Sequence, residues 1–214
     1  MMKIDFVSDV ACPWCAVGLN ALEIALKNIG DDIPVTLHMQ PFELNPDMGA
    51  EGVDAADYLM KKYGMSNEQL QGARDTLRER GAAVGFTFGE RSRVWNTFDA
   101  HRLLHWADIA GAPGQQRALK HALLQAYHAE GRNPGAHDVL LDLVTQLGMD
   151  VEAARGVLDA GTYTDEVREA EQFWQRNGIN AVPSVIINDR HLIQGGQPPE
   201  MFEHALRKIA AEDV

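Results

Sequence analysis

Short apolar segments near the N-terminus alternate with a helical pattern. Residues 3–7 and 35–39 are rich in side chains that favour β-strands, while residues 16–29 place apolar side chains at helical spacing. A strand, a helix and a second strand in this order predict two parallel strands joined by a right-handed crossover.

The middle of the chain, from about residue 55 to residue 177, has helical character. Glycine-containing segments divide it into pieces, and each piece repeats apolar side chains every three or four positions, as in the stripe Leu103, Leu104 and Ala107. Such stripes are typical of helices that pack on one another, so we expect a helical core in this part of the chain.

Strand character returns near the C-terminus. Residues 184–187 and 190–194 flank Asn188-Asp189, a dipeptide typical of a tight hairpin turn. Residues 199–211 then show helical spacing behind two prolines, which favour a helix start.

The two strand-bearing ends of the chain are expected to share one sheet. The order β-α-β, helical insertion, β-β-α assigns residues 1–50 and 178–214 to one α/β domain. Residues 51–177 then form an all-helical domain inserted into it.

Charge narrows the range of partners. The 19 Lys and Arg residues against 31 Asp and Glu residues give a net charge of −12, which disfavours nucleic acid and anionic membrane surfaces as partners. No apolar stretch approaches the roughly 18–20 residues of a membrane helix, and the first residues lack the apolar core of a secretory signal. Taken as a complete chain, the protein is expected in the cytoplasm.

The only two cysteines stand between the first strand and the first helix, as Cys12-Pro13-Trp14-Cys15. A disulfide across so short a loop would stabilise the fold little. A zinc site usually needs four ligands, and a c-type haem site needs a histidine where Ala16 stands. The spacing therefore favours redox chemistry, with a pair of inert structural thiols as the alternative.

The position of the motif suggests how the two sulfurs differ. Proline favours the first helical position, so Pro13 places Cys12 at the N-cap, where the amides of Trp14 and Cys15 would face its sulfur. Those amides and the helix dipole favour a thiolate, so we expect a lowered pKa at Cys12. Cys12 is then the attacking nucleophile, and Cys15, one turn further on, is the less exposed resolving thiol.

Other polar residues near predicted helix starts are weaker candidates. Asp9 could raise the thiol pKa or shuttle a proton, or it could be a solvated loop acid or local cap. Asn96 and Thr97 could cap the helix that follows them. His101 and His105 lie four residues apart, but no glutamate follows His101 as in the zinc-protease pattern, so packed or solvated histidines are expected and no metal is.

Several short motifs follow one another along the chain. They are Ser8-Asp9, Cys12-Pro13-Trp14-Cys15, Phe42-Glu43-Leu44-Asn45-Pro46, Asn96-Thr97 with Ala100-His101-Arg102, and Gly178-Ile179 with Val182-Pro183-Ser184. Over about residues 3–209 this set resembles the DsbA-like thioredoxin-fold oxidoreductases, and in detail their FrnE-like branch. The resemblance implies an α/β thioredoxin fold with an inserted helical domain.

The resemblance also implies a function and a site. Members of this branch are thiol–disulfide oxidoreductases, so we expect a disulfide-bearing protein or small molecule as substrate. It implies a cis peptide at Val182-Pro183 facing the cysteines, with the Val182 backbone free to pair with an extended substrate. Pro13 and Trp14 are then candidate substrate contacts.

The same resemblance places Asn96 and Thr97 beside the cleft as further candidate contacts. Trp14 could instead simply cover the core. It lacks the charge of a histidine at that position, so we expect a less oxidising couple than that of DsbA.

Related kappa-class glutathione transferases and 2-hydroxychromene-2-carboxylate isomerases typically carry serine where Cys12 stands. Both cysteines present here favour dithiol exchange, and a reducing cytoplasm favours reductase or isomerase activity. No tightly bound cofactor is expected, although glutathione could serve as electron donor or ligand. A glutathione-dependent transferase or isomerase, and a non-redox binding or chaperone module, are the alternatives.

Overall fold

The computed structural model describes residues 1–212 of the 214-residue chain. Its elements follow in chain order: β1 (Met2–Ser8), α1 (Pro13–Ile29), the 3-10 turn η1 (Gly30–Asp32), β2 (Val35–Pro41), β3 (Val53–Asp54), α2 (Ala55–Tyr63), α3 (Asn67–Ala83), β4 (Arg93–Val94), α4 (Phe98–Ala110), α5 (Gln115–His128), α6 (His137–Gln146), α7 (Val151–Asp159), α8 (Thr164–Arg176), β5 (Ser184–Ile187), β6 (His191–Gln194) and α9 (Pro199–Glu212). None of the helices within residues 1–212 is long and apolar enough to cross a membrane.

The two ends of the chain form one four-stranded sheet in the order β2-β1-β5-β6. β1 runs parallel to β2, with Met2 opposite Val35, and antiparallel to β5, with Ile4 opposite Ile187. β5 and β6 form the expected antiparallel hairpin. This order and these directions confirm the thioredoxin fold.

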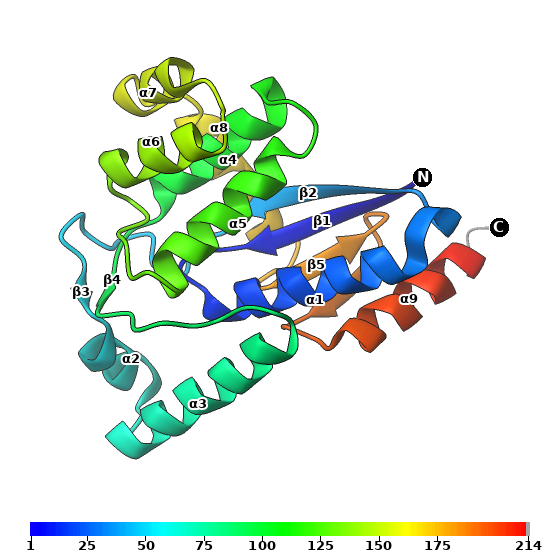
Figure 1. Cartoon of the computed structure of the whole chain (residues 1–214), viewed down its shortest axis with the longest axis horizontal. Coiled ribbons are helices and arrows are strands. Elements are labelled where there is room, and N and C mark those ends of the chain that lie inside the picture. The colour runs from blue at the N-terminus through cyan, green and yellow to red at the C-terminus, as the bar shows by residue number, and fades with distance from the viewer. Residues whose placement is uncertain (213–214) are drawn as a thin grey trace.

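The two faces of the sheet carry different layers because side chains alternate along each strand. Ile4 and Phe6 of β1 join the apolar core under α1 and α9, which lie side by side over one face (Figure 1). Val7 points the other way and packs with Trp174 of α8. The helix α8 therefore covers part of the opposite face.

The inserted region builds a second apolar core from α4, α5, α6 and α7, seen at the upper left of Figure 1. Val10 and Ala11, from the loop that precedes α1, belong to this second core. The insertion is not all-helical, because Val53 and Val94 pair in a two-stranded ribbon between β3 and β4. The loop with the cysteines thus lies where the two cores meet.

Candidate active site

The loop from β1 to α1 sets the position of both cysteines. Cys12 is the N-cap of α1 in extended conformation, and Pro13 occupies the first helical turn, as expected. The amide of Cys12 donates to the carbonyl of Asp9 at 3.2 Å, and the amide of Cys15 donates to the carbonyl of Cys12 at 3.1 Å. These two turns hold the loop against the end of the helix.

Both sulfurs are thiols and both are buried, but not equally. Cys12 keeps 4 % of its surface exposed and Cys15 keeps none. The Sγ of Cys12 lies 3.5 Å from the carbonyl oxygen of Val182, and the Val182-Pro183 peptide is cis, as expected.

The contacts of the Cys12 sulfur add detail to the predicted geometry. No side-chain hydrogen bond caps α1, because the Cys15 amide is taken by the Cys12 carbonyl and the Cys12 thiol points to Val182 instead. While Cys12 is a thiol, the Val182 carbonyl accepts its Sγ–H.

A glycine in α1 lets the proline loop reach the sulfurs. A Cβ added to Gly18 would lie 2.9 Å from Cγ of Pro183, closer than side chains tolerate. The carbonyl of Pro183 accepts the amide of Gly195 at 2.8 Å, which ties this loop to the end of β6. Gly18 therefore permits close packing beside the site, and the sequence pattern did not indicate it.

The surroundings separate the two thiol pKa values. The side chain of Cys15 hydrogen-bonds to Cys12 and holds the pKa of Cys12 below that of an ordinary thiol, against an opposing effect of burial. The backbone amides of Cys15 and Trp14 contribute in the same direction, although neither has the geometry of a side-chain cap. Burial, followed by the partner sulfur of Cys12, raises the pKa of Cys15 well above that of an ordinary thiol.

Asp9 is fully buried and accepts hydrogen bonds from several elements, so the solvated interpretation is wrong. Its carboxylate accepts the amides of Ala11 at 3.0 Å and Leu44 at 2.7 Å, the hydroxyl of Thr97 at 2.7 Å, and Nε2–H of His101 at 3.4 Å. Burial would raise its pKa, but His101 and the two amides outweigh burial and lower the pKa of Asp9. A carboxylate with so many donors and a lowered pKa is poorly suited to shuttling protons.

Asn96 and Thr97 lie near the loop but differ in access. Thr97 is the N-cap of α4 but makes no capping hydrogen bond with its side chain. The side-chain oxygen of Asn96, one residue earlier, accepts the amide of Phe98 at 2.8 Å. Thr97 is 2 % exposed and its hydroxyl donates to Asp9, which leaves no surface for the predicted substrate contact. Asn96 remains half-buried beside Glu43, to which it donates at 3.1 Å.

A buried acidic pair lies next to Asn96. Arg168 bridges the carboxylates of Glu43 and Glu171, and its guanidinium carbon lies 3.7 Å from the ring centroid of Phe98. Burial and the neighbouring Glu171 raise the pKa of Glu43, against the opposing effects of His101 and Arg168. This cluster was missed because Arg168 stands 125 positions after Glu43.

Two arginines flank the cysteine motif. The guanidinium of Arg80 lies 6.0 Å from the Trp14 ring and donates to the carbonyl of Gly196 at 2.9 Å. Arg91 donates to the carbonyl of Ala11 at 3.2 Å. Trp14 itself is half-buried, so it both covers the core and keeps an accessible face.

The helix α5 brings two further buried polar groups to the loop. His128 donates Nε2–H to the carbonyl of Val10 at 2.8 Å. Burial, then the neighbouring charge of Arg91, lowers the pKa of His128 to about 3, so its ring is neutral near pH 7. Lys120 is fully buried on the same helix.

The two histidines of α4 pack against neighbouring side chains. His101 contacts Asp9, and the ring of His105 lies 5.0 Å from that of Tyr163. Over residues 1–212, no group of three or more His, Cys, Asp or Glu side chains is arranged to hold a metal ion.

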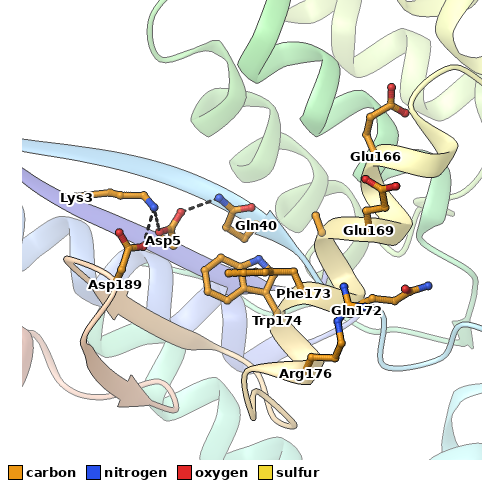
Figure 2. A pocket seen from close by; sticks show the side chains of 11 residues that line it. Lys3, Asp5, Gln40, Glu166, Glu169, Gln172, Phe173, Trp174, Arg176 and Asp189 are labelled. Atoms are coloured by element: carbon orange, nitrogen blue, oxygen red, sulfur yellow. Dashed lines mark hydrogen bonds and ion pairs between the residues drawn. The ribbon is translucent and has the colours of Figure 1, made fainter.

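An open hollow of about 690 Å³ lies on the face of the sheet shared with α8, away from the cysteines. Figure 2 shows Lys3 between Asp5 and Asp189, with Phe173 and Trp174 beside them. The ammonium of Lys3 lies 2.9 Å from Asp5 and 2.8 Å from Asp189, so this single cation is shared by two carboxylates. No residue of the cysteine motif lines this hollow.

Comparison with known proteins gives the same picture. The family model of the DSBA-like thioredoxin domain matches residues 3–207. The Bacillus subtilis (strain 168) protein YwbO is 30 % identical over 206 residues, covering 96 % of each chain. The crystal structure of the probable DsbA oxidoreductase SCO1869 from Streptomyces coelicolor has a TM-score of 0.91 and 34 % identity, over 99 % of this chain and 91 % of that one.

More distant structures share the fold. The cytosolic disulfide reductase DsbM from Pseudomonas aeruginosa, solved with GSH, has a TM-score of 0.69 at 17 % identity, over 98 % of this chain and 99 % of that one. A 2-hydroxychromene-2-carboxylate isomerase has a TM-score of 0.72 at 18 % identity, over 99 % and 97 % of the two chains. At these identities the two structures show a common fold. The match of the family model over residues 3–207 establishes that the chain belongs to the DsbA-like thioredoxin-domain family.

Proposed function

We propose that the protein is a thiol–disulfide oxidoreductase that works through the dithiol of Cys12 and Cys15. The observation that carries this proposal is the contrast between the two sulfurs. Cys12 stands at the start of α1 with a lowered thiol pKa and some exposure, whereas Cys15 is fully buried with a raised pKa. A nucleophile needs the first environment, and a resolving thiol tolerates the second.

The exchange follows from this contrast. The Cys12 thiolate attacks one sulfur of a substrate disulfide, forming a mixed disulfide and releasing the other substrate sulfur as a thiolate, which takes up a proton. Cys15 then loses its proton and attacks Cys12 Sγ, closing the Cys12–Cys15 disulfide and releasing the second substrate thiol. The substrate gains two electrons and two protons, and the protein loses them.

The neighbourhood of Cys12 supports binding of an extended substrate. When Cys12 becomes a thiolate it no longer donates to the Val182 carbonyl, which lies 3.5 Å away. That carbonyl can then accept a hydrogen bond from a backbone N–H of an extended substrate. The accessible face of Trp14 and the half-buried Asn96 are the proposed flanking contacts, together with Pro13.

The direction of exchange depends on the surroundings of the protein. DsbA-like proteins act on disulfide-bearing substrates, and DsbM is named a cytosolic disulfide reductase. We propose a reductase or isomerase for this chain too, acting in a reducing compartment, with a small monothiol such as glutathione returning the electrons.

Insulin reduction by the wild type, Cys12→Ser and Cys15→Ser tests the proposal. Cys12→Ser should lose activity by more than about a hundredfold, since the attacking thiolate is gone. Cys15→Ser should instead accumulate a mixed disulfide with substrate, visible by mass spectrometry. Equal activity of the wild type and Cys12→Ser would contradict the proposal.

A further inference from the structure

A buried cation on α5 is not used by the exchange described above. Lys120 has no exposed surface, and within residues 1–212 its ammonium nitrogen has no hydrogen-bond partner. Lysine is among the residues least often fully buried, because moving an ammonium out of water costs several kcal/mol unless it is paired. A lysine kept in such a place needs a compensating role.

The position of Lys120 is fixed from two sides. Gln116, one turn earlier on α5, accepts the amide of Met39 in β2 at 2.9 Å. His121, the next residue, lies 2.8 Å from the carboxylate of Glu23 in α1. These contacts hold α5 against both β2 and α1. Leu124, one turn after Lys120, belongs to the apolar core that contains Cys12 and Cys15, and His128, two turns after it, bonds to the carbonyl of Val10 in the cysteine loop. The fully buried Lys120 therefore lies on the part of α5 that packs against this loop.

The charges around Lys120 come from the cysteine loop. Cys15 acts on it most strongly, followed by Asp9 and then Cys12, and all three favour its charged form against the effect of burial. His128, on α5 itself, also interacts with Lys120 but is neutral near pH 7. Cys15 is thus the group whose ionisation Lys120 feels most.

Asp9 is a poor partner for this cation although it is a buried carboxylate. Its oxygens already accept the donors of Ala11, Leu44, Thr97 and His101, and it makes no hydrogen bond with Lys120 within the described residues. The Cys15 thiol has no such set of donors, and the positive charge of Lys120 favours the Cys15 thiolate.

We propose that Lys120 is the electrostatic partner of Cys15, stabilising the Cys15 thiolate in the step that resolves the mixed disulfide. The inference rests on the proposed dithiol exchange. In this step the bond from Cys12 to Cys15 forms and the bond from Cys12 to the substrate sulfur breaks. The proton lost by Cys15 ends on the departing thiol, so no external oxidant is needed. Lys120 acts through Cys15 and does not itself bond to substrate.

Reaction with 5,5′-dithiobis(2-nitrobenzoate) separates the two sulfurs in time. Attack by Cys12 releases one coloured thiolate, and attack by Cys15 on the resulting mixed disulfide releases the second. Cys15→Ser, which lacks the second phase, assigns it. The comparison is made between wild type, Lys120→Met and the exposed control Lys208→Met, from pH 6 to 10.

Lys120→Met should slow the second phase near pH 7 by about threefold for each unit by which the Cys15 thiol pKa rises, because a thiolate of higher pKa is scarcer although more nucleophilic. The midpoint of its pH profile should rise by about one unit. The first phase should change less, since Cys12 is the weaker partner, and Lys208→Met should match the wild type.

The outcomes separate a failure of the proposed dithiol exchange from a failure of the role proposed for Lys120. No rapid first phase in the wild type would contradict the proposed function itself. A normal first phase with a second phase unchanged in rate and pH midpoint in Lys120→Met would overturn the role of Lys120 alone.

A second measurement holds even if Lys120→Met does not fold. Coupling between two ionisable groups is reciprocal, so removing the Cys15 thiol must alter the titration of Lys120. NMR of ¹³C-labelled lysine should show the Lys120 side chain titrating at lower pH in Cys15→Ala than in the wild type. An unchanged titration would overturn the proposal.

Discussion

Two fully buried charges flank the cysteine loop, and they are satisfied in opposite ways. On the α4 side, Asp9 accepts hydrogen bonds from Ala11, Leu44, Thr97 and His101. On the α5 side, Lys120 has no hydrogen-bond partner among residues 1–212. Equal burial therefore does not imply an equal role. The carboxylate of Asp9 has a structural role, because its hydrogen bonds join three segments. The ammonium of Lys120 interacts with the two sulfurs through its charge.

The largest expected effect is on the Asp9 side. Asp9→Ala should lower the free energy of unfolding by about 3–5 kcal/mol, because several buried donors lose their acceptor at once. Urea unfolding at pH 7 measures it. Asp142→Ala, which removes an exposed carboxylate bonded to Arg132, should leave the unfolding midpoint nearly unchanged. If the two variants unfold alike, Asp9 is not architectural.

The pH dependence of stability reports on the ionisation of Asp9 in the folded protein. The pKa of Asp9 is lowered in the folded protein, so its contribution is present above the pKa of the unfolded chain, about 3.9. It is lost as the pH falls through the lower folded value. Thermal unfolding from pH 7 to pH 3 should therefore show a steeper loss for the wild type than for Asp9→Asn. Parallel curves would argue against a lowered pKa.

A smaller effect is expected from one donor. Thr97→Val keeps the shape of the side chain but removes the hydroxyl that donates to Asp9 at 2.7 Å. It should cost about 1–2 kcal/mol of unfolding free energy, as expected for a buried hydrogen bond to a charged group. Thr76→Val, on the exposed side of α3, is the matched control. A loss no greater than that of the control would show that the hydroxyl is dispensable.

The smallest effect, and one of opposite sign, is expected at Lys120. Lys120→Met should raise the free energy of unfolding by about 1 kcal/mol at pH 7, since an unpaired buried cation is replaced by an apolar chain of similar length. Burial lowers the Lys120 pKa, so the wild type gains stability as the pH rises towards the unfolded value near 10.4. The advantage of the variant should shrink over that range. A clear loss of stability at pH 7 would mean that the cation is paired.

Much of the fold is readable from local pattern. The strands at residues 2–8, 35–41 and 184–187 were recognised because each is a short apolar segment bounded by turn residues. The two-residue strands β3 and β4 were missed because pairing across 40 residues leaves no periodicity to detect.

The site is readable only where it is local in sequence. The four consecutive residues of the cysteine motif were enough to place Cys12 at the N-cap, because Pro13 among them favours the first helical turn. The partners of Asp9 stand up to 92 positions away, so a sequence shows only a loop acid. Lys120 lies three residues before the buried Leu123 on α5, but the sequence offers no reason to single it out, because lysine is so seldom buried.

Peptide-resolved alkylation against pH tests the contrast between the two sulfurs most directly. Reduced protein is treated with iodoacetamide from pH 4 to 11, and mass spectrometry follows Cys12 and Cys15 separately, with Cys15→Ser as the control that reports Cys12 alone. We expect Cys12 to react with a midpoint below that of a free thiol, about 8.5, and Cys15 to stay unreactive until much higher pH. Equal, ordinary midpoints at the two positions would contradict the assignment of an attacking and a resolving thiol.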